Sequence, residues 1–582
     1  MLKTIIKITL LGILLIFSIK NSLYSQTRFL KIDKNPLNYN LNLNGDSIVQ
    51  IFNLLKFKNF YIASGYLACN FDSILYKKDT TYVNFFVGAK HKINGIQIVS
   101  NDTNIIQRNI TQKKTTIEIR NETAVSLLNN LENNGFPFAE IKSQTNVDSN
   151  EQINFTLNID RGPFIRFDTL NIEGDNVLKK KFLAAYLGIQ LNTPYSESNF
   201  RKTLVKLNQL PFIAVEKNPL IAFVDGGLAK PYFYLKKRKT DQINGIVGFA
   251  PNSGIGQKLV FTGEVLLKLN NLFKSAKGLE LNWRSFNARS QEFKTRIKLP
   301  YLINKPFGLN YSLDLLKFDT LFTTINNRID FQYFTSGLNG IKFFYSVSAT
   351  NLNFVDTMQI KTSQNFPTIN AIQNKNYGLE ADFNFLDYIL NPQKGWLIDA
   401  GFSIGTKEIL RDNNISAIKL SNGKSLYDSI KLTNTQYNYR INIQKYFKTS
   451  TFTTLKINTL ISQTIAPKIF FNELFREGGI NSLKGFNEQS IFANNFNMLN
   501  IEFRYLISKN SHIGLFWNGA YIEDKSFGKT KATYDYPWGF GAGANIETGA
   551  GVLSLIYALG TQKNNPFDLR TGKIHFGISN YF

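Results

Sequence analysis

The sequence predicts a membrane β-barrel of about sixteen antiparallel strands, preceded by three small α/β modules. Three observations predict it: an N-terminus typical of exported proteins, a unit that recurs three times before residue 240, and alternation of apolar and polar residues from about residue 242 onward. The predicted segments are 1–25 for the signal peptide, 26–90, 91–163 and 164–240 for modules 1, 2 and 3, and 241–582 for the barrel.

The composition fits an ordered protein and excludes several classes. Of the 582 residues, 43% are hydrophobic and 19% charged, which is atypical of disordered chains. A single cysteine, Cys69, excludes an internal disulfide framework and a cysteine-based metal site. The net charge of +25 is spread along the chain, with only one short basic run at residues 236–239, so we expect no nucleic-acid partner.

The N-terminus has the three parts of a secretory signal. Lys3 and Lys7 precede an apolar run at residues 8–17, and a polar stretch follows at residues 21–26. A membrane anchor is the alternative, but it needs about 20 apolar residues and Lys20 interrupts the run too early. No later stretch is long enough for a transmembrane helix, so a membrane-spanning form of this chain has to be a barrel.

The N-terminal part contains a repeated unit of helix, turn and two alternating strands. The helical segments are expected at residues 46–59, 124–133 and 196–210, and the turns that follow begin at Gly65, Gly135 and Leu210. The strands that close the units are expected at 81–87, 152–159 and 231–235, and the third unit opens with a strand at 167–174. Three copies in order, 70 to 75 residues apart, predict tandem modules rather than chance fragments.

In the C-terminal part, apolar and polar residues alternate along the predicted strands. In the segments 377–385, 396–405, 437–444 and 573–582, apolar residues interleave with polar ones. A soluble sandwich needs a dry interior, whereas the polar faces here carry Glu, Asp and Arg, which favours lipid outside and water inside. Spanning strands of about 9 to 11 residues with their connections give roughly sixteen strands, and residues 392–395 are expected to form one tight turn.

These features together resemble a known family. Three modules ahead of a barrel are similar to the polypeptide-transport-associated (POTRA) domains and pore of BamA/TamA-type outer-membrane assembly factors, the bacterial surface antigen family. The most specific segment is residues 475–486, similar to the family's glycine-pair loop that folds back into the barrel lumen; its matching residues are Gly478, Gly479, Lys484, Gly485 and Phe486. Further similar segments lie at 500–505, 539–543 and 551–557.

Two residues depart from the family pattern. Lys484 stands where the family has arginine, and Asn518 stands near a family aspartate that faces the loop. Since an ammonium group cannot form the two parallel bonds of a guanidinium, the loop is expected to be held less tightly. The resemblance implies Glu502 as another acidic partner, so we predict a Lys484–Glu502 ion pair; the alternative is that Lys484 faces lumen water.

The C-terminal strand resembles the recognition signal of barrel substrates. His575, Gly577 and Phe582 match that signal in register, while Asn580 replaces a residue that is usually apolar.

Motifs of enzymes are present only superficially. Gly401-Phe402-Ser403-Ile404-Gly405 fits the nucleophile elbow, but Ser403 lies in an alternating strand with no helix after it. The glycines at 539, 541 and 543 lack the spacing of a dinucleotide loop. We therefore expect no catalytic residues, no metal and no cofactor.

The resemblance implies a bacterial outer-membrane protein with periplasmic modules. Its expected function is to receive unfolded outer-membrane or secreted clients and to aid their insertion into or passage across the membrane, in contact with the lipid bilayer and with possible periplasmic or inner-membrane accessory proteins. The alternatives are a two-partner-secretion export pore and, in another class, a passive porin or surface adhesin.

Overall fold

The computed structural model describes residues 29–33, 47–77, 80–100, 109–110, 117–147, 152–250, 260–287, 289–388, 391–479, 482–487, 489–548, 551–563, 567 and 572–579. The predicted signal peptide, residues 1–25, lies outside the described residues. The chain forms two compact units, residues 1–166 with 194–197 and residues 167–193 with 198–582.

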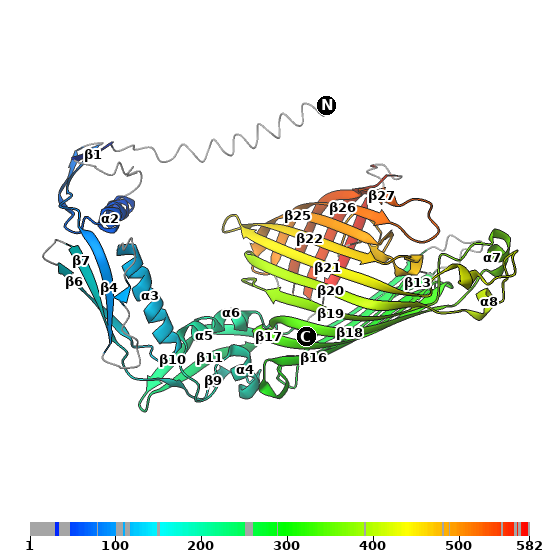
Figure 1. Cartoon of the computed structure of the whole chain (residues 1–582), viewed down its shortest axis with the longest axis horizontal. Coiled ribbons are helices and arrows are strands. Elements are labelled where there is room, and N and C mark those ends of the chain that lie inside the picture. The colour runs from blue at the N-terminus through cyan, green and yellow to red at the C-terminus, as the bar shows by residue number, and fades with distance from the viewer. Residues whose placement is uncertain are drawn as a thin grey trace. The chain divides into compact units, whose positions relative to one another are not determined.

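The first unit contains two small sheets, each covered by one helix (Figure 1). The first sheet has the order β1-β3-β2 and the second β5-β4-β7-β6. Their elements are β1 (Phe29–Asp33), α2 (Ser47–Ala63), β2 (Asn70–Lys77) and β3 (Thr80–Phe86), then β4 (Lys92–Ser100), β5 (Asn109–Ile110), α3 (Ile117–Asn133), β6 (Glu140–Val147) and β7 (Gln152–Asp160). In both sheets the strand before the helix runs parallel to the last strand, which also pairs with an antiparallel neighbour.

Both helices end in the same turn. Gly65 and Gly135 have φ angles of 100° and 98°, a region that glycine adopts at no steric cost. In each turn the residue after the glycine donates to a carbonyl five residues earlier, Tyr66 to Tyr61 and Phe136 to Leu131. This shared hydrogen bonding supports the repeat inferred from the sequence.

Alternating side chains of the sheets form the two cores. In β7 the residues Ile153, Phe155, Leu157 and Ile159 are buried on one face. The core of the preceding sheet is mainly aromatic and contains the single cysteine; its buried members are Phe57, Tyr61, Cys69 and Phe85. Burial raises the pKa of the Cys69 thiol, which fits a small packing residue.

A third sheet of the same connectivity belongs to the second unit. Strand β9 pairs in parallel with β11, and β10 pairs with β11 in antiparallel fashion. The elements are β8 (Arg166–Phe167), β9 (Asn171–Gly174), α4 (Lys180–Leu187), α5 (Glu197–Arg201), α6 (Thr203–Asn208), β10 (Ile213–Val224) and β11 (Leu228–Lys237). The helix expected at 196–210 is therefore two short helices, the strand expected at 167–174 is two short strands, and α4 was not predicted.

The rest of the second unit is one large antiparallel sheet. Its strands are β12 (Gln242–Ala250), β13 (Val260–Leu272), β14 (Lys277–Asn287), β15 (Ser290–Leu299), β16 (Phe307–Phe318), β17 (Phe322–Ser336), β18 (Asn339–Leu352), β19 (Ile372–Asn384), β20 (Gly395–Ile409), β21 (Thr433–Lys448), β22 (Thr453–Ile465), β25 (Asn495–Ser508), β26 (Ser511–Asp524), β27 (Thr533–Asp535), β28 (Trp538–Thr548), β29 (Gly551–Thr561) and β30 (Lys573–Ser579). Strands β27 and β28 both pair with β26 and are separated only by Tyr536 and Pro537. Counted as one strand, they give sixteen strands in the described part of the chain, as the sequence predicted.

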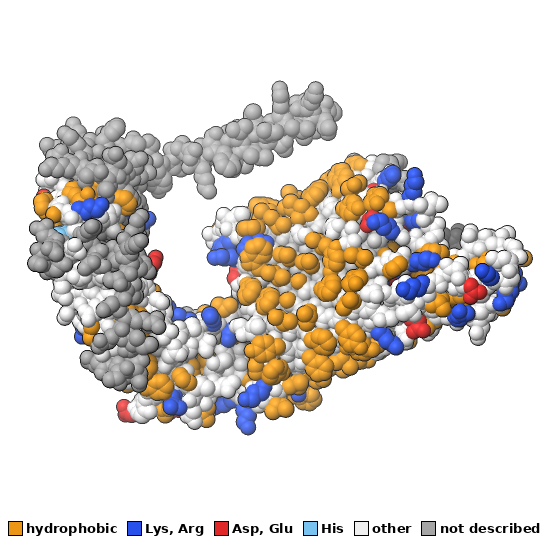
Figure 2. All heavy atoms as spheres, viewed as in Figure 1, with side chains coloured by type: hydrophobic (Ala, Val, Ile, Leu, Met, Phe, Trp, Pro, Cys, Tyr) orange, Lys and Arg blue, Asp and Glu red, His pale blue; other side chains and the backbone are white. Residues whose placement is uncertain are grey.

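The two faces of the sheet differ as the alternation predicted. Leu379, Phe402 and Leu515 are 57%, 51% and 65% exposed and lie on the outer face. Glu380, next to Leu379, and Gly401 and Ser403, on either side of Phe402, line a cavity inside the barrel. Figure 2 shows hydrophobic side chains covering the outer wall on the viewed face, with Lys and Arg gathered toward its rims. No helix in the described ranges is long and apolar enough to cross a membrane.

The third module packs on the turns at the near end of the barrel, where β12 begins. Tyr301 directly precedes the short helix η1 (Leu302–Asn304). The centre of its ring lies 5.9 Å from that of Tyr186 in α4 and 4.8 Å from that of Phe334. The amide of Gln209 donates to the carbonyl of Asn384 at 2.9 Å. These contacts fix this module to the barrel.

Connections at the opposite, far end pack into a hydrophobic dome. They include α7 (Thr357–Ser363), α8 (Asn413–Ser416) and η2 (Leu426–Ser429). The buried members of the dome are Ile360, Phe366, Ile372, Ile409, Ile415, Ile418, Leu426, Tyr427 and Phe470.

Candidate functional site

A loop inside the barrel is the main candidate site. It follows β22 and begins with η3 (Phe471–Glu473) and the short hairpin of β23 (Phe475–Glu477) and β24 (Ile491–Ala493). Residues 478–490, between the two strands of this hairpin, are called the lumen loop below.

The glycines of the lumen loop are required by its backbone. Gly478, Gly479 and Gly485 have φ angles of 109°, 97° and 96°, which L-amino acids with a side chain adopt at a cost. A Cβ atom on Gly478 would also lie 2.6 Å from the carbonyl oxygen of Asn487. The glycine pair therefore closes the neck of the loop, and Gly485 turns its tip.

The tip lies directly on two glycines of the barrel wall. A Cβ on Gly539 of β28 would meet the carbonyl oxygen of Lys484 at 2.7 Å, and one on Gly560 of β29 would meet that of Gly485 at 2.7 Å. Because backbone touches backbone here, larger residues at 539 or 560 would displace the loop.

Asn518 of β26 holds the backbone of the tip. Its Oδ1 accepts from the backbone N–H of Lys484 at 2.7 Å, and its Nδ2 donates to the carbonyls of Gly539 at 2.9 Å and of Lys484 at 3.3 Å. The side chain is fully buried. A carboxamide can donate and accept at once, whereas a carboxylate only accepts, so asparagine suits a backbone partner.

The side chain of Lys484 points to Glu502 of β25. Its Nζ lies 3.4 Å from Oε2 of Glu502 and 4.3 Å from the centre of the Phe516 ring. Glu502 also accepts from Nε of Arg504 at 2.9 Å. All of these side chains are buried, so Lys484 does not face open lumen water.

Apolar side chains of the loop add packing. Phe486 and Leu483 are buried against the inner wall in one cluster, whose other buried members are Leu460, Ile491, Ala493, Phe496 and Met498. The lumen loop is thus fixed by backbone, charge and packing together.

The base of the loop is anchored by a buried ion pair. Lys407, at the far end of β20, contacts the carboxylate of Glu473 and donates to the carbonyl of Lys468 at 2.8 Å. Glu473 also accepts from the backbone N–H of Phe470 at 2.7 Å. Both side chains are almost inaccessible to water.

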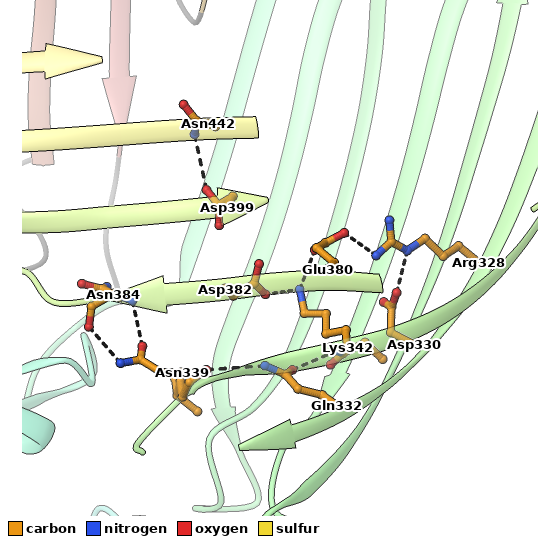
Figure 3. A network of polar contacts seen from close by, with 12 residues as sticks. Arg328, Asp330, Gln332, Asn339, Lys342, Glu380, Asp382, Asn384, Asp399 and Asn442 are labelled. Atoms are coloured by element: carbon orange, nitrogen blue, oxygen red, sulfur yellow. Dashed lines mark hydrogen bonds and ion pairs between the residues drawn. The ribbon is translucent and has the colours of Figure 1, made fainter. Parts of the chain in front are cut away.

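A charged network lines the inner wall on strands β17 to β21 (Figure 3). Arg328 donates to Asp330 at 2.6 Å and to Glu380, and Lys342 contacts Glu380 at 2.9 Å and Asp382. Asp399 accepts from Asn442 at 3.3 Å. These residues face a cavity of about 950 Å³ within the barrel, which therefore has a polar, hydrated interior.

Among the described residues, the first and last strands of the barrel are not paired. Strands β12 and β30 approach each other, yet among the described residues no backbone pairing links them. They have 9 and 7 residues, against 15 and 16 in β20 and β21 of the opposite wall. We call this junction the seam.

The C-terminal residues predicted from the sequence are partly described. His575 and Gly577 lie in β30, opposite Ile556 and Ser554 of β29. Phe582 lies outside the described residues. The recognition role of all three stays a prediction.

The residues that fit enzyme motifs lie within strands of the barrel. Ser403 lies within β20, which continues to Ile409, so no elbow forms. Gly539, Gly541 and Gly543 alternate along β28, where Gly541 and Gly543 would crowd Tyr557 and Ile556 if they carried a Cβ. Among the described residues no group of His, Cys, Asp or Glu side chains is arranged to hold a metal ion.

Sequence reasoning missed several contributors to the site. Gly560, the Lys407–Glu473 pair and Lys456, which lies opposite Glu502 on the neighbouring strand, were not singled out. The sequence marks such residues only as charged side chains on the polar face of an alternating strand. Most strands carry residues of this kind, so the pattern does not show which of them contact the loop.

The chain is similar to known outer-membrane barrels. The sequence profile of the Omp85 superfamily domain matches residues 271–582. Among solved structures, CdiB from Acinetobacter baumannii is similar with a TM-score of 0.51 and 13% identity over 96% of this chain and 90% of that chain. For CdiB from Escherichia coli the values are 0.52, 12%, 92% and 97%.

BamA from Haemophilus ducreyi lacking POTRA domains 1–3 is also similar, with a TM-score of 0.41 and 15% identity over 84% of this chain and all of that chain. No protein with curated function matches the sequence.

Fold and site together define a membrane β-barrel with α/β modules at its N-terminal side and a loop folded into its lumen. The chain belongs to the Omp85 superfamily, whose profile covers more than half of it. It is an outer-membrane protein with periplasmic N-terminal modules. Members of this superfamily are assembly factors and transporters rather than enzymes.

Proposed function

We propose that this protein receives unfolded client chains through three POTRA-like modules, residues 26–90, 91–163 and 164–240, and aids their insertion at the barrel seam. The proposed partners are outer-membrane or secreted clients, the lipid bilayer, and periplasmic or inner-membrane accessory proteins. The role is non-enzymatic and needs no cofactor, since burial of client apolar surface in lipid supplies the driving force.

The unpaired seam carries this proposal. Backbone N–H and C=O groups without partners are costly within a bilayer, several kcal/mol each by order of magnitude. Strands β12 and β30 each present one such edge in the described residues. A client strand that pairs with either edge satisfies these groups, so the barrel wall favours strand addition at this place over any other.

The edges of the module sheets support a receiving role. Strand β6 is the last strand in the order β5-β4-β7-β6, and its residues 142–146 are exposed. An exposed sheet edge binds an extended chain through backbone hydrogen bonds and therefore demands little sequence.

Site-directed crosslinking tests insertion at the seam. In a Cys69→Ala background, single cysteines replace Ile243 of β12 and Ile574 of β30, both exposed on the outer face. We expect both positions to crosslink to nascent barrel clients in cells. The matched control is Leu379→Cys on β19, which is equally exposed but has paired neighbours on both sides. Equal crosslinking from all three positions would contradict the proposal.

A two-partner-secretion pore is the second candidate. The similarity to CdiB structures over more than nine-tenths of this chain favours it, because each of those chains is covered almost completely as well. The presence of three modules rather than two favours assembly. Depletion followed by an inventory of the envelope separates the two: loss of many barrels indicates assembly, and loss of one secreted protein indicates the dedicated pore.

A further inference from the structure

A partly enclosed cavity lies between the lumen loop and the barrel wall. Its volume is about 350 Å³, which is ample for a small ion. We call it the basic cavity. The loop contributes Ser482 and Lys484, and strands β22, β25 and β26 contribute its other charged residues, Lys456, Glu502, Arg504 and His512.

The charges around the basic cavity do not balance. Lys456, Lys484 and Arg504 carry three positive charges, and Glu502 is the one carboxylate among the described residues that line it. Arg504 and Lys484 already contact that carboxylate, at 2.9 and 3.4 Å. Lys456, whose Nζ lies 5.7 Å from the centre of the Tyr446 ring, forms no ion pair within 4 Å with any described residue. An excess of positive charge in a partly enclosed site is unfavourable, so the cavity favours an added anion.

Polar atoms in the cavity also lack partners. Nδ1 of His512 and Oδ1 of Asn500 are buried and form no hydrogen bond with described atoms. His512 is held at Nε2 by Asn545 at 3.1 Å, which leaves Nδ1 to act as a donor. Donors therefore converge on the space from three strands.

The geometry points to a binding site for a small divalent oxyanion, inorganic phosphate or sulfate, in the basic cavity. Lysine and arginine supply charge-assisted hydrogen bonds, which oxyanions accept on several oxygens. The lining side chains face the lumen and lie beneath the loop, so a lipid headgroup with its acyl chains does not fit. Chloride lacks the several acceptor atoms that this set of donors can fill.

Anion binding is linked to the position of the lumen loop. Lys484 and Ser482 belong to the loop, whereas Lys456, Arg504 and His512 belong to the wall. An anion that contacts both parts binds the docked loop better than an undocked one and therefore stabilises docking. The inference is independent of which clients the barrel handles.

Calorimetric titration of the purified mature protein in detergent with inorganic phosphate tests the site. We expect one saturable site per chain that sulfate competes for and chloride does not at equal ionic strength. Lys456→Met is expected to weaken phosphate binding by at least about tenfold, because one charge-assisted contact is lost. Lys445→Met is the matched control: it removes the same charge from β21, where Lys445 lies over the Trp396 ring on the outer face.

A second variant changes affinity in the opposite direction. Glu502→Gln removes the competing negative charge and is expected to bind phosphate at least about threefold more tightly. Correct folding of each variant is checked by the mobility of the unheated barrel on a gel. No phosphate binding beyond that of chloride, or equal affinity in the wild type and Lys456→Met, would overturn the inference.

Discussion

At the scale of single residues, the lumen loop is held by an amide rather than by a carboxylate. A lysine at position 484 cannot form the two parallel hydrogen bonds that an arginine forms with a carboxylate. Asn518 contacts the Lys484 backbone instead, in both directions. Lys484 and Asn518, the two residues that differ from the family pattern, are therefore compatible with each other. The loop stays docked without an arginine–aspartate pair.

Replacement of Asn518 tests this arrangement. Asn518→Asp keeps the acceptor for the Lys484 N–H but places a carboxylate against two carbonyl oxygens, so we expect the barrel to lose about 1–3 kcal/mol of stability. Asn500→Asp is the control on the neighbouring strand, where the new charge faces Lys456 and Arg504 and is expected to be tolerated. The measurement is the temperature at which the folded band disappears on a gel. Equal temperatures for wild type and Asn518→Asp would show that the Asn518 carboxamide does not hold the loop.

A buried lysine in the third module makes a pH-dependent contribution. Lys206 of α6 is 8% exposed and donates to the carbonyl of Leu187 at 2.7 Å. Burial, and then the nearby charge of Lys202, lowers its pKa from 10.5 to about 8. Since the folded pKa lies below the unfolded one, the unfolded state binds more protons between about pH 8 and 10.5, and stability rises with pH across this window.

We therefore expect the third module to resist urea better at pH 10 than at pH 8. Pulse proteolysis of the full chain measures this, because the modules are cleaved while the barrel stays protected. Lys206→Met is expected to abolish the dependence, and Lys202→Met, on the same segment, to reduce it only slightly. An unchanged pH dependence in Lys206→Met would show that another group is responsible.

At the scale of elements, the strands were predictable and the loops were not. Period-two alternation sets the face of each residue, and the expected number of sixteen strands follows from chain length and the span of a bilayer. Pro537 interrupts the strand formed by β27 and β28, since proline cannot donate to the ladder. The place where the lumen loop meets the wall depends on contacts such as Lys484 with Gly539, which join residues far apart in sequence.

The anchor of the loop base gives an element-scale prediction. Lys407→Met leaves Glu473 buried and unpaired, which costs about 3–5 kcal/mol by analogy with other buried pairs. The double variant Lys407→Met with Glu473→Gln removes both charges and is expected to recover most of this loss. Heat-dependent gel mobility and protease sensitivity between residues 465 and 495 report the effect. Additive losses in the double variant would show that the two side chains do not act as a pair.

At the scale of the whole molecule, the lumen of the barrel is partly filled. The lumen loop occupies part of the interior, and the connections at the far end pack together in the hydrophobic dome. A hydrated, charged wall surrounds the remaining cavity of about 950 Å³. This arrangement differs from that of a passive porin, whose lumen is open to water along its length.

Conductance in planar bilayers distinguishes a barrel with a docked lumen loop from a passive porin. The intact mature chain is expected to give small, brief currents, because the docked loop blocks the path of ions. Replacing residues 478–490 by a short Gly-Ser linker removes that block and is expected to raise the mean conductance several-fold, whereas the Lys445→Met control keeps the intact behaviour. Removal of residues 26–240 leaves the loop in place and is expected to leave the currents small. Large steady currents from the intact chain would instead assign the barrel to the porin class, since they would show that the docked loop does not block the path of ions.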